Sequence, residues 1–358
     1  MKHVAIVIGQ LCSGGAERVA VLWAKGFVAG GNRVTIISDT AKSIDYEIPS
    51  GVELCHFDFS EIKKNFLRTA FNFRREIKSL SPDMLITVLY PINILALFAT
   101  CNLNIPIVNT EHNSFERPNS SRLSFFSKFS KFFFNKFFSR VTILTEADKR
   151  VIGKKLKNVS VMPNPLAFAP LETLPIKEKV IVASGRLDAW HYKGFDLLIE
   201  AWAKLAREYP DWNLKICGDG SDESLSYLKS LVCKYEVENQ ITFLGFRKDI
   251  QSIYKASSIF VLSSRYEGFG MVLIEAMSQG CACVACDYKG RQHEIIENDS
   301  QGVLCEPDNV DSLVVALRKL LADESYRTEC QKNAIERSKY YELNNVMKFW
   351  DEICKKLL

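Results

Sequence analysis

Short apolar runs alternate with segments of helical spacing along the first half of the chain. Each run has the length of a buried strand, and the segments between the runs place apolar residues on one side of a helix. The strands that we expect lie at residues 4–9, 34–38, 84–89, 105–109, 141–145 and 159–162. Helices are expected at residues 19–27, 63–78, 122–140 and 146–155. Strands that alternate with helices predict a parallel sheet.

The same pattern restarts after a stretch without periodicity that contains Pro170 and Pro175, which we interpret as a linker. Strands are expected at residues 180–183, 214–217, 241–244, 259–262, 282–285 and 302–304. Helices are expected at residues 195–209, 225–235, 250–256, 271–277, 291–297 and 311–322. A chain of 358 residues suits two domains. We predict an α/β protein with two Rossmann-like domains, residues 1–165 and 176–340, whose parallel sheets face each other across a cleft.

The composition is that of an ordinary globular protein, with 47% hydrophobic and 25% charged residues. No apolar run reaches the ~20 residues of a membrane span, so we expect a cytoplasmic protein. The eleven cysteines lie mostly in apolar runs, as reduced core thiols do. Cys283 and Cys286 form a Cys-x-x-Cys pair, with Cys281 and His293 nearby, but no second ligand pair has the spacing of a zinc site. We therefore expect no metal site.

The positive charge is concentrated in the first half of the chain. Residues 1–165 contain 22 Lys and Arg against 13 Asp and Glu, a net charge of +9, whereas the remainder carries 24 against 29, a net charge of −5. A basic, aromatic helix is expected at residues 63–78, which include Arg74 and Arg75. A basic half favours an anionic partner, such as a membrane surface or a phosphorylated lipid. No aromatic RNA-binding signature accompanies the charge, which argues against nucleic acid.

Residues 122–140 have the most unusual composition, with eight phenylalanines, five basic residues and no acid. On a helix, Lys128, Lys131 and Asn135 share one side, phenylalanines occupy the other, and Lys136 falls on the apolar side. Such a helix can lie in a bilayer interface with its lysines on anionic head groups. The alternative is a helix packed in the domain core, with its lysines extended to water.

The stretch at residues 263–279 contains the most informative chemistry. Gly268 and Gly270 follow an expected strand and precede an expected helix, so backbone N–H groups there suit an anion such as a diphosphate. Glu267 and Glu275 are carboxylates that can accept hydrogen bonds from sugar and ribose hydroxyls. The alternative is a strand-to-helix turn with two solvated glutamates.

Two cations flank another strand-to-helix connection. Arg186 and Lys193 follow the expected strand at residues 180–183. Two positive side chains at this point can clamp a diphosphate and stabilise it as it leaves. The alternative is that both are ordinary surface charges.

The first half offers a glycine turn and a histidine at expected strand ends. Gly14 and Gly15 can bring backbone against a phosphate or a sugar, or are needed only for a tight turn. The surrounding residues do not form a Gly-x-Gly-x-x-Gly fingerprint or a phosphate-binding loop, which argues against a hydride enzyme or an NTPase. His112 lies just past the expected strand at residues 105–109, where open sheets bind ligands, although a lone histidine is more often structural.

Several of these residues belong to motifs that occur in one order along the chain. The motifs are Gly-Gly-Ala-Glu-Arg at 14–18, Glu-His-Asn at 111–113, Pro-Asn-Pro at 163–165, Gly-Arg-Leu at 185–187 with Lys193-Gly194, Gly-Asp-Gly at 218–220, Phe-Leu-Gly at 243–245, and Glu267 and Glu275 with seven residues between them. In this order they resemble the family 4 retaining glycosyltransferases of the GT-B fold, over essentially the full length. The likeness is greatest to bacterial transferases that build lipid-linked glycans.

The resemblance implies that the C-terminal domain binds a nucleotide sugar, usually a UDP-sugar. Arg186 and Lys193 then hold the diphosphate, Glu275 the ribose and Glu267 the sugar, while His112 meets the donor sugar from the first domain. Further donor contacts are implied for Gly14, Gly15, Asn164, Gly185, Arg247, Gly268, Phe269 and Gly270. With Arg186, Lys193 and helix amides opposing the phosphate charge, no metal or other cofactor is expected. Retention is expected to follow from attack of the acceptor hydroxyl on the face that the diphosphate leaves.

The resemblance also implies that the final helix, within residues 341–358, returns to complete the first domain. The acceptor that we expect is a polyprenyl-diphosphate-linked saccharide, reached by a peripheral protein on the cytoplasmic face of the membrane. Its contacts with membrane and acceptor are assigned to Arg74, Arg75, Lys128, Lys131 and Lys136. Two rival readings are a UDP-sugar isomerase on the same fold, which makes product from donor alone, and a non-catalytic protein that binds sugar nucleotides.

Overall fold

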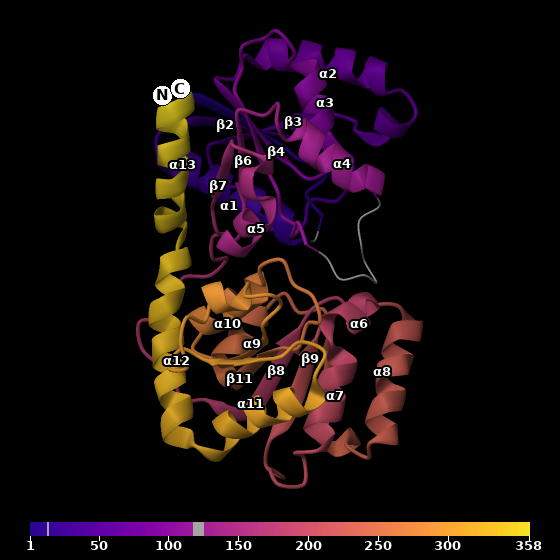
Figure 1. Cartoon of the computed structure of the whole chain (residues 1–358), viewed down its shortest axis with the longest axis vertical. Coiled ribbons are helices and arrows are strands. Elements are labelled where there is room, and N and C mark those ends of the chain that lie inside the picture. Colours follow the sequence, from indigo (N-terminus) through magenta and orange to yellow (C-terminus); the bar gives the residue numbers. More distant parts are fainter. Residues whose placement is uncertain (13, 117–124) are drawn as a thin grey trace. The chain divides into compact units, whose positions relative to one another are not determined.

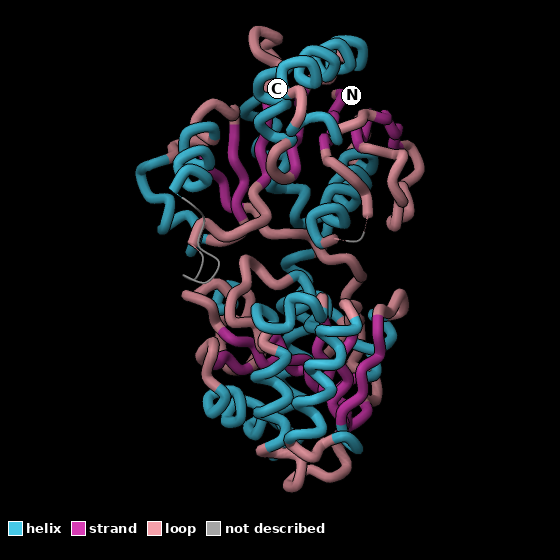
Figure 2. Tube along the Cα trace, turned by 90° about the vertical axis from the view of Figure 1, so that its right-hand side faces the viewer, coloured by secondary structure: helices cyan, strands magenta, loops and turns pink. Residues whose placement is uncertain are grey.

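The computed structural model describes residues 1–12, 14–116 and 125–358. The chain forms two compact units. The first unit comprises residues 1–167 and 343–358, and the second comprises residues 168–342 (Figure 1). Each unit has a sheet of its own, and Figure 2 shows the strands of each sheet among helices. No helix in these described ranges is long and apolar enough to cross a membrane.

The first unit is built on a seven-stranded sheet with the order β3-β2-β1-β4-β5-β6-β7. All neighbouring strands pair in parallel. The strands are β1 (His3–Val7), β2 (Arg33–Ser38), β3 (Val52–His56), β4 (Met84–Val88), β5 (Ile107–Thr110), β6 (Arg140–Ile143) and β7 (Val159–Val161). β1 and β4 are fully buried, as expected for central strands of a parallel sheet covered on both faces. The strand order reverses between them, which is where open sheets bind ligands.

The second unit repeats this design with a six-stranded sheet in the order β10-β9-β8-β11-β12-β13. These strands are also parallel. They are β8 (Glu178–Ser184), β9 (Asn213–Cys217), β10 (Ile241–Gly245), β11 (Ser257–Leu262), β12 (Ala282–Cys286) and β13 (Val303–Cys305). The order reverses between β8 and β11, so residues that follow these two strands share the predicted ligand position.

Helices cover the sheets of both units. The first unit has α1 (Gly15–Ala29), α2 (Phe66–Leu80), α3 (Ile92–Ala99), α4 (Phe125–Phe134), α5 (Glu146–Ile152) and α13 (Leu343–Leu357). The second unit has α6 (Trp190–Lys193), α7 (Phe195–Ala203), α8 (Asp222–Lys234), α9 (Ile250–Ala256), α10 (Met271–Ser278), α11 (Val310–Ala322) and α12 (Glu324–Ser338). Buried side chains of α7, α8 and α11 share one apolar cluster with the strands of the second sheet.

The last helix, α13, packs against α1 of the first unit. Trp350 is fully buried, and its ring lies 5.2 Å from that of Trp23 and 5.4 Å from that of Phe27. Gly26 makes room for this contact, because a Cβ there would lie 2.4 Å from the Sδ atom of Met347. The chain therefore returns to the first unit after forming the second.

One expected helix is absent. Residues 291–297 contain only a short 3-10 helix at Gln292–Glu294. The Oδ1 atom of Asp287 accepts from the backbone N–H groups of Gln292 and His293, and the N–H of Tyr288 donates to the Gln292 side chain. Such local side-chain bonds to the backbone compete with helix formation. The sequence pattern was therefore wrong here.

Candidate functional site

The predicted residues of the second unit follow neighbouring strands. Gly185 and Arg186 come after β8, and the loop at residues 263–270 comes after β11, which pairs with β8. In parallel sheets, the carboxyl ends of adjacent strands lie at one edge, where ligands bind at a reversal of strand order. The sheet thus brings together chemistry that lies about 80 residues apart in the sequence.

Two predicted site residues form an ion pair at this edge. Lys193 Nζ lies 2.7 Å from Oε2 of Glu267, and both side chains are only partly exposed. Ser263 Oγ donates to the backbone carbonyl of Lys193 at 2.9 Å, and Ser264 Oγ donates to the same Glu267 oxygen at 3.3 Å. The loop after β11 is therefore fastened to the end of α6.

Gly194 makes this close approach possible. It has φ +65, and a Cβ at this position would lie 2.0 Å from the carbonyl oxygen of Ser263. Only glycine combines the left-handed conformation with this lack of bulk. A second close approach involves Gly218, with φ +150, where a Cβ would lie 1.8 Å from the carbonyl oxygen of Gly185. Both glycines let the site loops pack backbone against backbone.

Arg265 holds the same loop from its other side, and the sequence patterns did not single it out. Its guanidinium donates to both oxygens of Asp196 at 2.7 and 2.8 Å and to Asp308 at 2.5 Å. It also donates to the carbonyl of His191 at 2.7 Å. A planar guanidinium can satisfy several acceptors at once, so Arg265 ties the loop to α6, α7 and the segment after β13.

The glycine-rich segment opens α10 as expected. Gly270 adopts φ +97 at the N-cap of α10, and a Cβ there would lie 3.2 Å from Leu262. The Phe269 ring is buried against Tyr341, at a centroid distance of 5.7 Å, and its carbonyl accepts from Gln292. Gly268 is partly exposed. The first N–H groups of a helix carry partial positive charge, so this turn suits an anion.

Glu275 lies deeper than a solvated carboxylate would. It is 3% exposed on α10. Burial raises the pKa of Tyr254 well above its usual value, and the nearby negative charge of Glu275 raises it further. The Tyr254 hydroxyl lies 2.5 Å from Oγ of Ser184, at the end of β8. The alternative of two solvated glutamates is therefore wrong for Glu275.

Arg186 and Arg247 differ in whether their side chains already have a partner within the protein. The Arg186 side chain is exposed and, in the part of the chain that the structure describes, makes no hydrogen bond or ion pair. Arg247 instead donates two hydrogen bonds to the carboxylate of Asp249, at 2.8 and 2.7 Å. Arg186 is thus available to a ligand as it stands, whereas the Arg247 side chain would first have to leave Asp249.

In the first unit, His112 follows β5, and its ring lies 5.6 Å from that of Trp23. Nε2 lies 3.1 Å from Oγ1 of Thr110, which itself donates to the carbonyl of Thr87. Because that hydroxyl proton is used, Nε2 must be the protonated nitrogen and Nδ1 a hydrogen-bond acceptor. Nδ1 is buried and has no partner among the described residues. Burial lowers the pKa of His112 to about 4, so the ring is neutral at pH 7.

The loop that carries His112 is held at both ends. On one side, Glu111 accepts from Lys131 at 2.9 Å and from Asn135 at 2.9 Å. On the other side, Asp148 accepts from Oγ of Ser114 at 2.9 Å and from N–H of Phe115 at 2.8 Å. No sequence pattern indicated these supporting contacts, because Glu111 bonds to Lys131 on α4 and Asp148 on α5 bonds to the loop after β5. His112 is therefore a positioned residue on a fixed loop.

The other predicted residues of the first unit occupy different environments. The N–H and carbonyl of Gly14 both bond to the hydroxyl of Tyr46, each at 2.7 Å, and Gly15 begins α1. The Gly14 amide is therefore already used by a residue that sequence reasoning missed. Asn164 is buried, and within the described ranges its Oδ1 has no partner. Such an orphaned buried oxygen is a candidate for a ligand contact.

Two of the predicted basic contacts have structural partners. Lys131 points inward to Glu111, with only 14% of its side chain exposed, so this lysine does not face water. Arg74 donates to the carbonyls of Ala99 and Cys101 at 2.8 and 2.6 Å and so caps α3. Each of the two side chains thus has partners within the protein, and their assignment to head groups or acceptor stays a prediction.

The remaining basic candidates are less constrained. Arg75 and Lys136 are exposed. The side chain of Lys128 lies outside what the structure describes. These observations leave Arg75 and Lys136 as basic groups that can meet a partner.

The cysteine cluster near β12 is part of the core. Cys281, Cys283 and Cys286 are buried free thiols, and Cys286 Sγ lies 3.5 Å from Sγ of Cys305 on the neighbouring strand. Burial raises the pKa of Cys281 to about 11 and that of Cys283 well above its usual value. Protonated thiols are poor nucleophiles and poor metal ligands.

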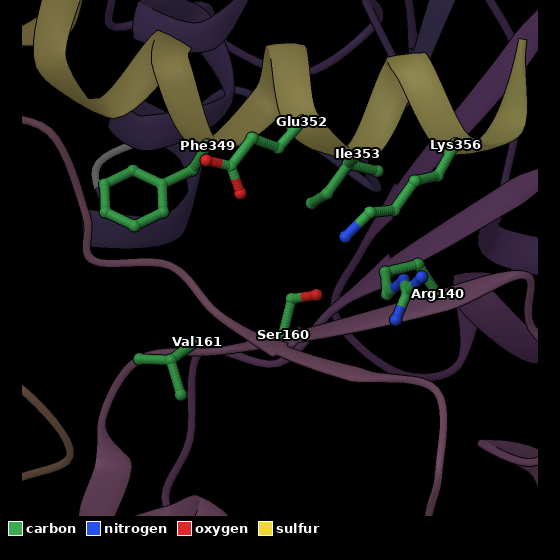
Figure 3. Close-up of a pocket in the computed structure, with 7 residues that line it drawn as sticks. All are labelled: Arg140, Ser160, Val161, Phe349, Glu352, Ile353 and Lys356. Carbon is green, nitrogen blue, oxygen red and sulfur yellow. The ribbon is translucent and has the colours of Figure 1, made fainter.

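A small pocket of about 50 Å³ lies elsewhere in the first unit. It is lined by Arg140, Ser160, Val161, Phe349, Glu352, Ile353 and Lys356. Figure 3 shows the side chains of α13 on one side of this space and those of Ser160 on β7 and Arg140 on β6 on the other. None of the sequence-predicted site residues lines it, so it is separate from the proposed chemistry.

Two protein-family models match the chain. The model for Glycosyltransferase Family 4 matches residues 13–167, and the model for Glycosyl transferases group 1 matches residues 171–337. An uncharacterized glycosyltransferase of Haemophilus influenzae is 30% identical over 359 residues, which cover 99% of this chain and 100% of that protein. A Campylobacter jejuni protein is 28% identical over 371 residues, which cover 96% of this chain and 96% of that protein. Its name is N-acetylgalactosamine-N,N'-diacetylbacillosaminyl-diphospho-undecaprenol 4-alpha-N-acetylgalactosaminyltransferase.

Solved structures show the same architecture. Anabaena HepE, in complex with UDP and glucose, matches with a TM-score of 0.82 and 19% sequence identity, over 99% of this chain and 100% of that chain. This likeness and the two parallel sheets confirm the GT-B fold that the sequence predicts. The chain therefore belongs to the family 4, group 1 glycosyltransferases and is an enzyme that transfers a sugar.

Proposed function

We propose that this glycosyltransferase moves a hexose or N-acetylhexosamine from a UDP-sugar to a polyprenyl-diphosphate-linked saccharide, with retention at the anomeric carbon. One observation carries the proposal. Arg186, Lys193, Glu267 and the amino end of α10 gather at the ends of β8 and β11, where the strand order reverses. This set offers two cations and helix amides for a diphosphate, with a carboxylate beside them for a sugar hydroxyl.

The reaction needs charge stabilisation at the leaving group. As the bond between the anomeric carbon and the diphosphate oxygen breaks, negative charge grows on the phosphates. The exposed Arg186 guanidinium is ready to oppose that charge, and the N–H groups that open α10 add fixed dipoles. Lys193 is held nearby by Glu267 and can contact the diphosphate without leaving the loop.

Glu267 then has two tasks. Its Oε2 accepts from Lys193 and Ser264. A carboxylate has lone pairs to spare, so Oε1 can accept from a donor-sugar hydroxyl. In this arrangement Glu267 orients both the cation and the sugar, and it is a binding group more than a general base.

His112 supplies a neutral acceptor in the first unit. Its Nδ1 lone pair has no partner among the described residues, and a hydroxyl of the donor sugar would satisfy it. The family resemblance assigns this contact. Retention would follow if the acceptor hydroxyl attacks the face that the departing diphosphate leaves, with a phosphate oxygen taking its proton.

The relatives support the donor and acceptor classes. The Campylobacter jejuni relative is named for transfer to a saccharide on diphospho-undecaprenol, and the Anabaena structure contains UDP. We extend both classes to this chain and place it at the cytoplasmic face of the membrane. That no metal is needed stays a prediction, argued from Arg186, Lys193 and α10.

The proposal is tested by incubating the purified protein with a panel of UDP-sugars, with and without a bacterial lipid extract. We expect one UDP-sugar to be hydrolysed slowly alone and transferred to lipid when extract is present, equally with and without EDTA. Arg186→Met and Lys193→Met should lose most of the turnover, whereas Lys332→Met, an exposed lysine on α12, should not. A protein that consumes no UDP-sugar even with lipid extract contradicts transfer. A new UDP-sugar formed from donor alone favours the isomerase.

A further inference from the structure

A continuous chain of ring contacts crosses three helices of the first unit. The Phe66 ring on α2 lies 5.3 Å from that of Phe98 on α3, which lies 6.3 Å from that of Phe134 on α4. Phe133 extends the chain to Phe134 at 5.3 Å, and its own ring also contacts those of the residues one turn before and after it. Figure 1 shows α2, α3 and α4 grouped in this unit.

Much of this chain is open to water. The exposed rings are those of Phe98, Phe129, Phe133 and Phe137, and α2 adds the exposed side chains of Leu67 and Phe71. We call these six residues the aromatic face. Their exposed fractions run from 43% for Phe133 to 78% for Leu67. Scattered apolar residues on a surface need no explanation, but exposed rings joined by ring contacts, as those of Phe98, Phe129, Phe133 and Phe137 are through Phe134, mark an interaction site.

The orientation of α4 explains why these rings face outward. The helix turns its polar side inward, where Lys131 and Asn135 bond to Glu111. Phe129 and Phe133, on the opposite side, are therefore left at the surface. Of its other rings, Phe132 packs against Phe115 and Phe134 against Phe98. An amphipathic helix in water normally buries its whole apolar side, so the exposed rings of Phe129 and Phe133 indicate an apolar partner.

The surroundings of the aromatic face are basic. Exposed cations on or beside α2 and next to α4 are Lys63, Lys64, Arg68, Arg75, Lys78 and Lys136. The acids on or beside α2, Glu61 and Glu76, are fewer than these cations; Glu61 pairs with one of them, Lys64, at 3.2 Å, and Glu76 accepts from the thiol of Cys55. Apolar rings surrounded by cations complement an anionic lipid surface, with the rings at the acyl boundary and the cations at the head groups.

We propose that the aromatic face docks this protein on the surface of an anionic phospholipid bilayer. The inference rests on the proposed function, because a lipid-linked acceptor has to be reached at a membrane. It differs from the sequence-based expectation in one respect. The phenylalanines, and not Lys131, make the contact, so apolar insertion provides most of the affinity and basic residues add a salt-sensitive part.

The test is cosedimentation of the full chain with vesicles of phosphatidylglycerol and of phosphatidylcholine. We expect stronger binding to phosphatidylglycerol, with a part that survives high salt. Phe133→Ser combined with Phe137→Ser should lower the partition coefficient at least about ten-fold on both lipids. The control replaces two exposed apolar residues of the second unit, Ile176 and Val315, with serine, and should bind as wild type does.

A second pair of variants tests the basic surroundings. Arg68→Glu with Arg75→Glu should weaken binding to phosphatidylglycerol and leave binding to phosphatidylcholine unchanged. The matched control, Lys229→Glu with Lys332→Glu, places the same charge change on exposed positions of α8 and α12. Equal losses in both pairs would show that only net charge matters and would overturn the assignment to this face.

Other outcomes separate this inference from the proposed function. Wild-type protein that does not bind either vesicle, or phenylalanine variants that bind as well as wild type, overturn the docking surface. A dimer that is seen by ultracentrifugation and lost in the phenylalanine variants, without vesicle binding, assigns the face to a second copy of the chain instead. Sugar transfer to a water-soluble, short-chain acceptor should persist in the phenylalanine variants. Vesicle binding without any sugar transfer contradicts the proposed function alone.

Discussion

Lys131 Nζ lies 2.9 Å from Oε2 of Glu111, and each side chain is only 14% exposed. The lysine also donates to the carbonyl of Asn113 at 3.3 Å and lies over the ring of Phe115. α4 thus places a cation against the residues on both sides of His112. Lys131 thus joins the surface helix to the loop after β5, together with Asn135, which also donates to Glu111.

Lys131→Met should lower both stability and turnover. The substitution leaves the Glu111 carboxylate largely buried with one partner fewer, and loss of one partner of such a pair costs about 3 kcal/mol. Urea unfolding measures the stability, and steady-state kinetics measures the turnover that depends on the position of His112. Lys136→Met, at an exposed position close by, is the control and should change stability by less than about 0.5 kcal/mol. Equal urea midpoints for Lys131→Met and wild type would show that the pair does not hold the loop.

The contact between Lys131 and Glu111 also shows what could not be predicted from the sequence. Helical spacing correctly places Lys131 on the side of α4 opposite to Phe129 and Phe133, and Asn135, which follows the helix, bonds to the same Glu111. Which side faces inward depends on Glu111, at the end of a different strand. A segment with strong amphipathic character predicts two faces, and only tertiary contacts decide which of them meets the protein.

The central strands and most helices could be predicted because they are buried, apolar and bounded by turn residues. The edge strand β3 (Val52–His56) was not predicted, since its pattern is mostly exposed and has no clear alternation. The helix α12 (Glu324–Ser338) was not predicted either. Its buried positions include Arg327 and Gln331, which find partners in Leu320 and Ser258, so hydrophobic periodicity gives no signal.

For the candidate site, strand ends and glycine turns were enough to select Lys193 and Glu267. The residues that hold the site together were not found. Arg265, Tyr254 and Tyr46 act through partners that are distant in sequence, and nothing local marks them. Residue types can therefore predict ligand contacts at a sheet edge, while the supporting residues need the fold.

The neutral state of His112 should make the protein less stable in acid. In the folded protein burial lowers the pKa of His112 to about 4, whereas the unfolded chain has the ordinary value near 6.5. Between pH 4 and pH 6.5, His112 binds a proton in the unfolded state but stays neutral in the folded state. Its contribution to the free energy of unfolding is therefore fully present above pH 6.5 and is lost as the pH falls towards 4. The loss attributable to His112 is about 3 kcal/mol over this window.

The measurement is urea unfolding at a series of pH values for wild type and His112→Gln. Other groups titrate in the same range, so the difference between the two proteins isolates His112. The variant should lose less stability on acidification than wild type does. Parallel curves would mean that His112 is charged alike in both states. Turnover of wild type should show no ionisation of His112 between pH 6 and pH 9.

Glu275→Gln and Glu267→Gln should separate binding from turnover. Glu275 is 3% exposed, so alanine would leave a cavity, and the isosteric amide is the better probe. Glu275→Gln should weaken the affinity for UDP about ten-fold with little change in kcat, and Glu267→Gln should mainly lower kcat, because the cation and the sugar lose their common acceptor. Calorimetry with UDP and steady-state kinetics measure the two effects, and Glu223→Gln on α8 is the control. Equal UDP affinity in wild type and Glu275→Gln would refute the ribose assignment.

Gly194→Ala should be far more damaging than Gly31→Ala, although both glycines have positive φ. At Gly31, with φ +75, a Cβ would meet nothing within 4 Å, so alanine there costs only the conformational strain of about 1 kcal/mol. At Gly194 the Cβ would lie 2.0 Å from the carbonyl oxygen of Ser263. The backbone of Ser263 would have to move, and this shift would disturb the contact between Lys193 and Glu267. We expect Gly194→Ala to cost more than about 3 kcal/mol in urea unfolding, and to weaken UDP binding under conditions where it is still folded. If the two variants lost equal stability and bound UDP alike, the close packing of α6 on the loop after β11 would not be needed for the site.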